Sequence, residues 1–162
     1  MRHILRQRDL VADDWSYLGE ETAGEALIVP LASLRDDEAR WRAWHGRLGV
    51  RLGPADAPEE LAPWLARLAL IAVEFPNPGD GRGYSQARLL RARLKFRGEL
   101  RAVGAGVKQD QVFLLARCGF DAIELAPGED PQAARRALGR YTVGYQPGSP
   151  AVPLARQRFP AP

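Results

Sequence analysis

One loop concentrates the residue types that could bind a charged ligand. Residues 80–85, Asp-Gly-Arg-Gly-Tyr-Ser, follow residues 68–75, the most apolar run in the chain. Arg82 supplies a planar, permanently charged guanidinium that suits bidentate recognition of an oxyanion. Gly81 and Gly83 allow the backbone to approach a ligand closely. The loop therefore predicts an anion site for a carboxylate, a phosphate or a sulfur oxyanion.

A tight turn between a strand and a helix explains the same residues. In that interpretation Asp80 accepts backbone hydrogen bonds, and Arg82 pairs with Glu74 or another surface acid. The spacing does not match the dinucleotide motif, because Gln86 stands where the third glycine would be, and there is no P-loop lysine. The sequence leaves the anion site and the structural turn open, and it gives nucleotide binding no support.

The candidate ligand-binding residues lie where predicted strands end, because ligands of parallel sheets bind outside the carboxyl ends of the strands. They are Glu74, Asp80, Gly81, Arg82, Gly83, Tyr84, Ser85 and Asp110. In this hypothesis Tyr84 and Ser85 donate hydrogen bonds, and Glu74 with Asp80 orients Arg82 or accepts protons. Asp110 lies near a helix start, where aspartate is more often an N-cap than a general base. No residue is assigned as catalytic.

Cysteine and histidine are too sparse to predict a metal site. Cys118 is the only cysteine, so the chain forms no internal disulfide and has no metal-ligand spacing. Its place near a helix end disfavours a reactive thiolate. His3 and His45 have no acid, serine or cysteine at a recognisable spacing. No flavin, haem, iron–sulfur or nicotinamide signature is present, so the cofactor stays open.

Composition favours a globular, cytoplasmic protein. The 162 residues include 23 basic and 20 acidic side chains, for a formal charge of +3. Arginine is spread among aspartate and glutamate rather than clustered, which argues against nucleic-acid binding. The first ten residues lack the apolar stretch of a signal peptide, and no segment reaches the ~20 apolar residues of a membrane span. The oligomeric state stays open.

The hydrophobic pattern predicts an α/β fold. Apolar runs predict strands at residues 26–31, 50–52, 68–75, 100–103 and 122–125. Between and after them, helices are expected at residues 33–48, 58–67, 84–95 and 131–140. One more helix is expected through Val112, Leu115 and Ala116, with its end near Gly119. Five mainly parallel strands alternating with helices form one domain, either an open three-layer sheet or a structure like a partial barrel.

Three regions are expected along the chain. Residues 1–20 form an N-terminal β-hairpin or arm, residues 21–146 the α/β domain, and residues 147–162 a proline-rich tail that we expect to be disordered. The four tryptophans are interpreted as packing residues, with an exposed aromatic patch as the alternative.

Four segments carry a resemblance to a known family. They are LIAVEFP at residues 70–76, DGRGYSQARLLR at 80–91, GELRAVG at 98–104 and RCGFD at 117–121. The chain resembles the bacterial domain of unknown function 934 family from residue 1 to about residue 146. Members of that family are described as oxidoreductases involved in sulfite reduction, commonly encoded beside assimilatory sulfite reductase. The family tends to carry an aspartate where this chain has Ala105, so any role of that carboxylate is in doubt here.

The resemblance implies an accessory protein of assimilatory sulfite reduction. Combined with the loop, it predicts that residues 74–86 bind an oxyanion or a redox partner of the sulfite reductase system. The alternative is a non-catalytic module that docks on sulfite reductase through the tryptophan-bearing first helix or the N-terminal hairpin. A third hypothesis, an oxidoreductase with a bound cofactor, rests on the resemblance alone.

Overall fold

The computed structural model describes residues 2–7, 9–20 and 24–139, so the tail predicted at residues 147–162 lies outside the described part. Within it, eight strands form one sheet in the order β2-β1-β8-β7-β6-β5-β4-β3. Their bounds are β1 His3–Arg6, β2 Asp9–Ala12, β3 Ser16–Tyr17, β4 Ala26–Pro30, β5 Arg47–Leu52, β6 Leu68–Glu74, β7 Glu99–Val103 and β8 Ala122–Ile123.

The central strands are parallel, as the alternation of strands and helices predicts. Strands β3 to β8 run parallel, and β6 lies between β5 and β7. Strand β1 pairs antiparallel with both β2 and β8, so the predicted N-terminal hairpin is confirmed and belongs to the main sheet. The α/β fold class is confirmed.

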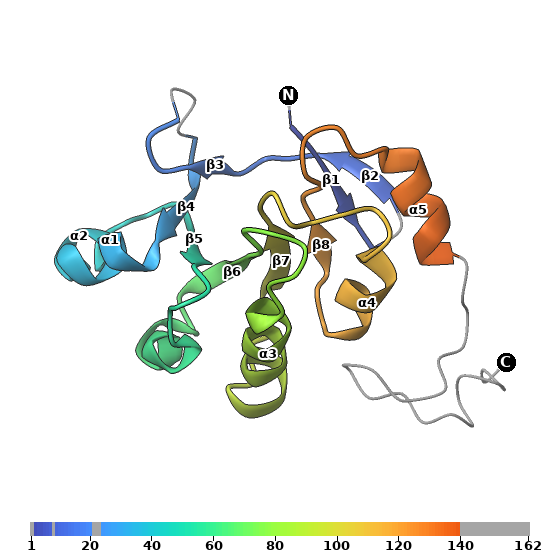
Figure 1. Cartoon of the computed structure of the whole chain (residues 1–162). Coiled ribbons are helices and arrows are strands. Elements are labelled where there is room, and N and C mark those ends of the chain that lie inside the picture. Colours follow the sequence, from blue (N-terminus) through green and yellow to red (C-terminus); the bar gives the residue numbers. More distant parts are fainter. Residues whose placement is uncertain (1, 8, 21–23, 140–162) are drawn as a thin grey trace, which may run out of the picture.

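The sheet curls into an open half-barrel, which selects the partial barrel from the two predicted alternatives. Strands β2 and β3 form its two edges, yet only residues 13–15 separate them in the chain. A flat sheet of this width would place its edges about 34 Å apart at ~4.8 Å per strand. Four residue steps reach at most about 14 Å. The short crossing from β2 to β3 therefore requires strong curvature (Figure 1).

The helices are shorter and less regular than the sequence pattern predicts. They are α1 Leu31–Asp36, α2 Glu38–Arg42, the 3₁₀-helix η1 Pro58–Trp64, α3 Arg82–Arg88 followed by the π-helix η2 Leu89–Arg93, α4 Val112–Arg117 and α5 Pro131–Gly139. The single helix predicted at residues 33–48 is wrong. Asp37 interrupts it, because its side chain accepts a hydrogen bond from the amide of Arg40 and caps a new helix.

Two apolar cores lie on opposite faces of the sheet. The larger one packs the helices against one face, which we call the outer face, with Leu48, Val50 and Leu52 of β5 in it. The smaller core, on the inner face, contains Trp15, Ala26, Ile28, Leu70, Ala72 and Val103. Trp15 comes from the crossing segment and is only 6% exposed, so this segment fills the hollow of the half-barrel.

Three of the four tryptophans are confirmed as packing residues. Trp15, Trp41 and Trp64 are buried, and Trp44 is half-buried against the larger core. None of the helices in the described ranges combines the length and the apolar character needed to cross a membrane.

Candidate functional site

The predicted loop lies where the sequence places it. Strand β6 ends at Glu74 in the middle of the parallel sheet, and α3 begins at Arg82. Within the loop, the Arg82 guanidinium donates from Nε to Asp80 Oδ1 at 2.9 Å and from Nη2 to Asp80 Oδ2 at 2.5 Å. The Arg82 backbone amide also donates to Asp80 Oδ1, at 3.1 Å. Asp80 therefore fixes the orientation of Arg82 from two residues away.

This pairing leaves part of the arginine accessible. The Arg82 side chain is 61% exposed, and its Nη1 atom donates no hydrogen bond to any described residue. The hydrogen bonds from Arg82 lower the pKa of the Asp80 carboxyl from its usual value to about 2. Asp80 thus stays ionised at neutral pH, and the pair combines one fixed cation with one fixed anion.

The two glycines of the loop have different roles. Gly83 is buried, and a Cβ atom there would lie 2.5 Å from Cζ of Phe75, so its role is close packing of α3 on β6. Gly81 has no atom within 4 Å of a built Cβ. Gly81 therefore leaves open space beside Arg82, whereas the space beside Gly83 is filled by Phe75.

The candidates Tyr84, Ser85 and Asp110 do not converge on Arg82. The Tyr84 ring packs edge to face on Phe75 with centroids 5.1 Å apart, and burial raises the pKa of its phenol. Ser85 and Asp110 are exposed. Asp110 is not the predicted N-cap, because α4 begins at Val112 with Gln111 at the cap position and no side-chain cap bond.

Glu74 points away from Arg82 and toward the inner face. It accepts a hydrogen bond from Arg51 at 2.5 Å, so it does not orient Arg82 as predicted. Arg51 lies two residues after Gly49 on β5, and Glu74 two residues after Ala72 on β6. Because side chains alternate along strands, both share the inner face with the smaller core.

Three more polar residues join this pair at the carboxyl end of the sheet, and none of them is among the candidate residues predicted from the sequence. The Tyr17 hydroxyl donates to Glu124 Oε2 at 2.8 Å, which links the edge strand β3 to the end of β8. The Arg2 guanidinium stacks on the Tyr17 ring at 4.6 Å, and that of Arg51 lies 5.9 Å from it. We call Arg2, Tyr17, Arg51, Glu74 and Glu124 the mouth of the half-barrel.

A buried ionic network lies below the mouth. The Arg101 guanidinium is fully buried and donates to Asp13 at 2.9 and 3.0 Å and to Glu99 at 2.8 and 3.0 Å. Asp13 belongs to the crossing segment, and its side chain is 1% exposed. Arg101 therefore ties that segment to β7, and a ligand cannot reach it without displacing the segment.

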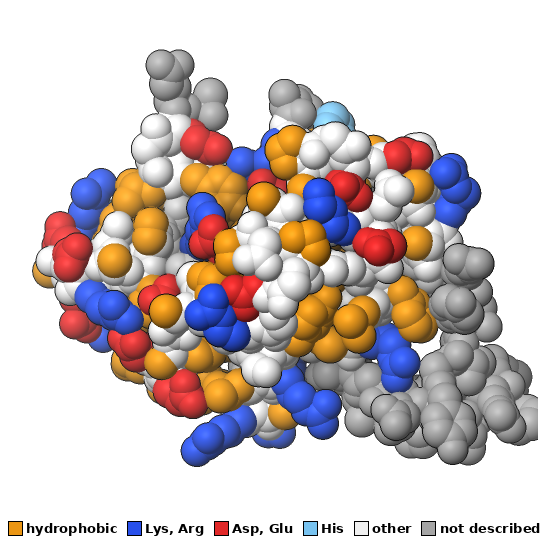
Figure 2. Space-filling view, in the orientation of Figure 1, with side chains coloured by type: hydrophobic (Ala, Val, Ile, Leu, Met, Phe, Trp, Pro, Cys, Tyr) orange, Lys and Arg blue, Asp and Glu red, His pale blue; other side chains and the backbone are white. Residues whose placement is uncertain are grey.

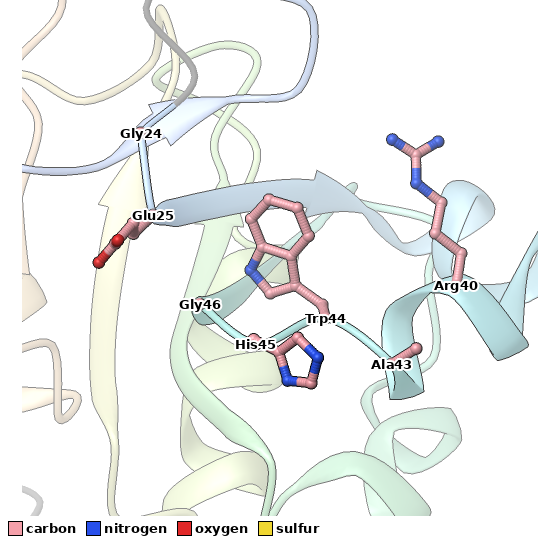
Figure 3. A pocket seen from close by; sticks show the side chains of 7 residues that line it. All are labelled: Gly24, Glu25, Arg40, Ala43, Trp44, His45 and Gly46. Atoms are coloured by element: carbon pink, nitrogen blue, oxygen red, sulfur yellow. The ribbon is translucent and has the colours of Figure 1, made fainter.

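A cavity of about 590 Å³ lies at the opposite end of the strands, where β4 and β5 begin (Figure 3). Its lining includes Glu25, Arg40, Trp44 and His45. The Trp44 indole nitrogen is buried and has no hydrogen-bond partner in the described part of the chain. None of the sequence-predicted candidates lines this cavity.

Neither a metal centre nor a reactive thiol emerges from the described residues. No three of their His, Cys, Asp or Glu side chains come together in an arrangement that could hold a metal ion. Cys118 is half-buried at the end of α4, and desolvation raises the pKa of its thiol despite the nearby Arg88 and Arg117. A raised thiol pKa disfavours the nucleophilic thiolate at neutral pH.

Comparison with known proteins identifies the family and no activity. Among curated proteins, no relative of this chain was found. The sequence profile of a bacterial protein of unknown function (DUF934) matches residues 49–154, well over half of the 162 residues. The matched region contains the Asp80–Arg82 pair, the Arg51–Glu74 ion pair and the buried Arg101. The chain therefore belongs to the DUF934 family of bacterial proteins.

Proposed function

We propose that this protein is an accessory factor of assimilatory sulfite reduction that binds a small oxyanion at residues 74–86, with Arg82 as the binding group. The link to sulfite reduction comes from the family resemblance of the sequence. The binding role is supported by one observation above the others: Asp80 holds Arg82 in place at the carboxyl end of a central parallel strand, with most of the side chain exposed.

The fixed guanidinium is suited to an anion because little side-chain freedom is lost on binding. The N–H groups of Nη1 face no acceptor among the described residues and remain free for an oxyanion. The open space at Gly81 gives a ligand access to the backbone beside them. The neighbouring Asp80 charge opposes an anion, so we expect modest affinity that weakens as salt screens the guanidinium.

Titration calorimetry with sulfite, sulfate and phosphate tests the proposal. Wild-type protein should bind at least one of them, and Arg82→Ala should abolish the heat of binding. Arg136→Ala on α5 is the matched control, because it also removes one exposed arginine that pairs with an aspartate. Equal binding by wild type and Arg82→Ala would remove the loop from the function. No binding of any of the three anions would refute oxyanion binding itself.

The cofactor-dependent alternative has a direct test. A flavin, haem or iron–sulfur centre absorbs visible light. An absorption spectrum and an intact mass of freshly purified protein would reveal such a group. A featureless spectrum together with the mass of the bare chain supports the accessory role, and a stoichiometric chromophore would contradict it.

Docking on a partner remains the second candidate, but the surfaces predicted for it fit poorly. Trp41 of the first helical region is 1% exposed. Removal of residues 1–20 would delete β1 from within the sheet and Trp15 from the smaller core. That truncation would therefore unfold the protein rather than isolate a contact surface.

A further inference from the structure

One segment of the molecule carries positive charge without any negative charge. Between residues 81 and 98 there are six basic residues and no aspartate or glutamate. The segment comprises α3, η2 and the turn into β7. Its basic residues are Arg82, Arg88, Arg91, Arg93, Lys95 and Arg97.

Two of these six side chains have structural partners. Arg82 binds Asp80. Arg91 donates to the carbonyl oxygens of Phe96, Gly98 and Gly119 and pairs with Asp121. The Arg91 contacts hold η2 against the turn into β7.

The other four basic residues are free in the described part of the chain. Arg88, Arg93, Lys95 and Arg97 are exposed and form no ion pair with any described residue. By contrast, several exposed arginines elsewhere pair with acids, such as Arg35 with Glu60 and Arg47 with Asp14. Four unneutralised cations along one short segment create a local positive potential that attracts an acidic partner. We call these four residues the basic face.

An exposed apolar side chain lies on α4, the next helix along the chain after the basic face. Leu114 of α4 is 50% exposed, the largest exposed fraction among the big apolar side chains of the described residues. Arg88 influences the Cys118 thiol electrostatically, and the Cys118 amide donates to the Leu114 carbonyl one helical turn away. In Figure 2, basic side chains gather at the lower end of the molecule over α3, and apolar side chains lie above and beside them.

We propose that the basic face and Leu114 form a docking surface for an acidic protein segment that carries an exposed apolar side chain. An apolar centre with a charged rim is the usual composition of a protein interface, and complementary charge speeds association. Binding to this surface is independent of oxyanion binding at Arg82, because the four cations of the basic face are separate from the Asp80–Arg82 pair.

Charge argues against the chain's own C-terminal segment as the occupant. Residues 140–162 contain three arginines and no acid. The basic face would repel that segment.

A nucleic acid fits less well than an acidic protein. The basic face offers four charges on one segment, whereas the chain as a whole carries only +3. Of the two aromatic residues in the segment 81–98, Phe96 is buried and the ring of Tyr84 packs on Phe75, so neither offers a free face on which a base could stack next to these cations.

Fluorescence anisotropy with a defined probe tests the proposal. The probe is a fluorescein-labelled helical peptide rich in glutamate with two leucines one turn apart; a glycine–serine peptide of equal length and a 20-base-pair DNA duplex serve as comparisons. Wild type should bind the acidic peptide in low salt and lose it as salt rises. Arg93→Glu with Arg97→Glu should weaken binding about tenfold or more, which corresponds to ~1.4 kcal/mol.

Arg135→Glu with Arg136→Glu on α5 is the matched control, because it makes the same change in net charge at another exposed surface. That variant should bind like wild type, as should Arg82→Ala, which separates this proposal from the oxyanion site. Leu114→Ala should weaken binding without changing its salt dependence. Arg93→Gln with Arg97→Gln, checked by circular dichroism, replaces the glutamate variant if that one misfolds.

Three outcomes would overturn the proposal. They are no binding of the acidic peptide in low salt, an equal loss of affinity in the control pair, and tighter binding of the DNA duplex than of the peptide. The last would assign the basic face to a nucleic acid.

Discussion

Two arginine–aspartate pairs in this fold have the same chemistry and opposite surroundings. Arg101 donates to both oxygens of Asp13 inside the half-barrel, where its side chain is fully buried. Arg82 donates to both oxygens of Asp80 at the carboxyl end of the sheet, where its side chain is 61% exposed. In each pair the aspartate fixes the position of the arginine side chain.

The difference shows that an ion pair cannot be assigned a role from its partners alone. The inner pair joins the crossing segment to β7 and excludes water, so loss of one partner leaves a buried charge. In the outer pair the arginine remains hydrated, so the electrostatic contribution of the pair to folding is small. Burial therefore marks Arg101 as a structural residue and leaves Arg82 as the residue that can bind a ligand.

Replacement of the inner arginine should have the largest effect on stability. Arg101→Met would remove the fully buried cation between Asp13 and Glu99 and leave them only the partly exposed Arg2 and Arg6. We expect a loss of about 3–5 kcal/mol in the free energy of unfolding. Urea unfolding followed by circular dichroism measures it. Arg51→Met is the control on the same face. Because Arg51 is 38% exposed, its replacement should lower the free energy of unfolding by less than about 1 kcal/mol. Equal losses in both variants would contradict the distinction.

A methyl group added to the inner face should have an intermediate effect. A Cβ at Gly49 would lie 3.2 Å from atoms of Ile28, Leu70 and Trp15, which pack in the smaller core. Gly49→Ala should therefore cost about 1–3 kcal/mol by overpacking.

Gly81→Ala, in the outer loop, is the control for this substitution. Gly81 has open space around it and a φ of −84°, which alanine adopts without strain. It should leave the urea midpoint unchanged or slightly raise it. A tolerated Gly49→Ala would mean that Trp15 can move, and the crossing segment would then not be fixed.

The central strands could be predicted from sequence because their signal is local. The apolar runs at residues 26–31 and 68–75 overlap closely with β4 and β6. The closure of the half-barrel could not be predicted, because it depends on contacts between Trp15 and residues far along the chain, such as Leu70 and Val103. The predicted helix at residues 33–48 failed for a related reason: Leu48 belongs to β5, whose pairing with β4 and β6 overrides the helical spacing.

Only one part of the candidate site, the loop of residues 80–85, could be predicted from the sequence. Residues 80–85 are adjacent in sequence, so their composition revealed the loop. The mouth joins Tyr17 to Glu124 across 107 residues, and that contact requires the strand order. Arg51 and Glu74 carried one usable signal, because each is a charged residue between apolar neighbours at or near the end of a strand.

The smallest expected effect is a change in one pKa at the outer pair. Hydrogen bonds from Arg82 lower the pKa of Asp80 to about 2, so the pair's contribution to folding is fully present above the usual aspartate pKa and is lost as pH falls through about 2. In Arg82→Ala the pKa should rise toward the ordinary value near ~3.9. Carbon-detected NMR of the carboxyl groups measures it, and the urea midpoint at pH 7 should not change.

Asp14 provides the internal reference for this measurement, because its pKa is lowered by a hydrogen bond from Arg47 and it lies outside the loop. Its titration should be the same in wild type and in Arg82→Ala. If Asp80 kept a pKa near 2 without the guanidinium, the backbone amide of residue 82 would be its main partner. Arg82 would then not be the group that Asp80 holds in place, and the basis for a preorganised anion site would be lost. A rise confined to Asp80 would show that the two side chains form one unit, with the arginine held ready for a ligand.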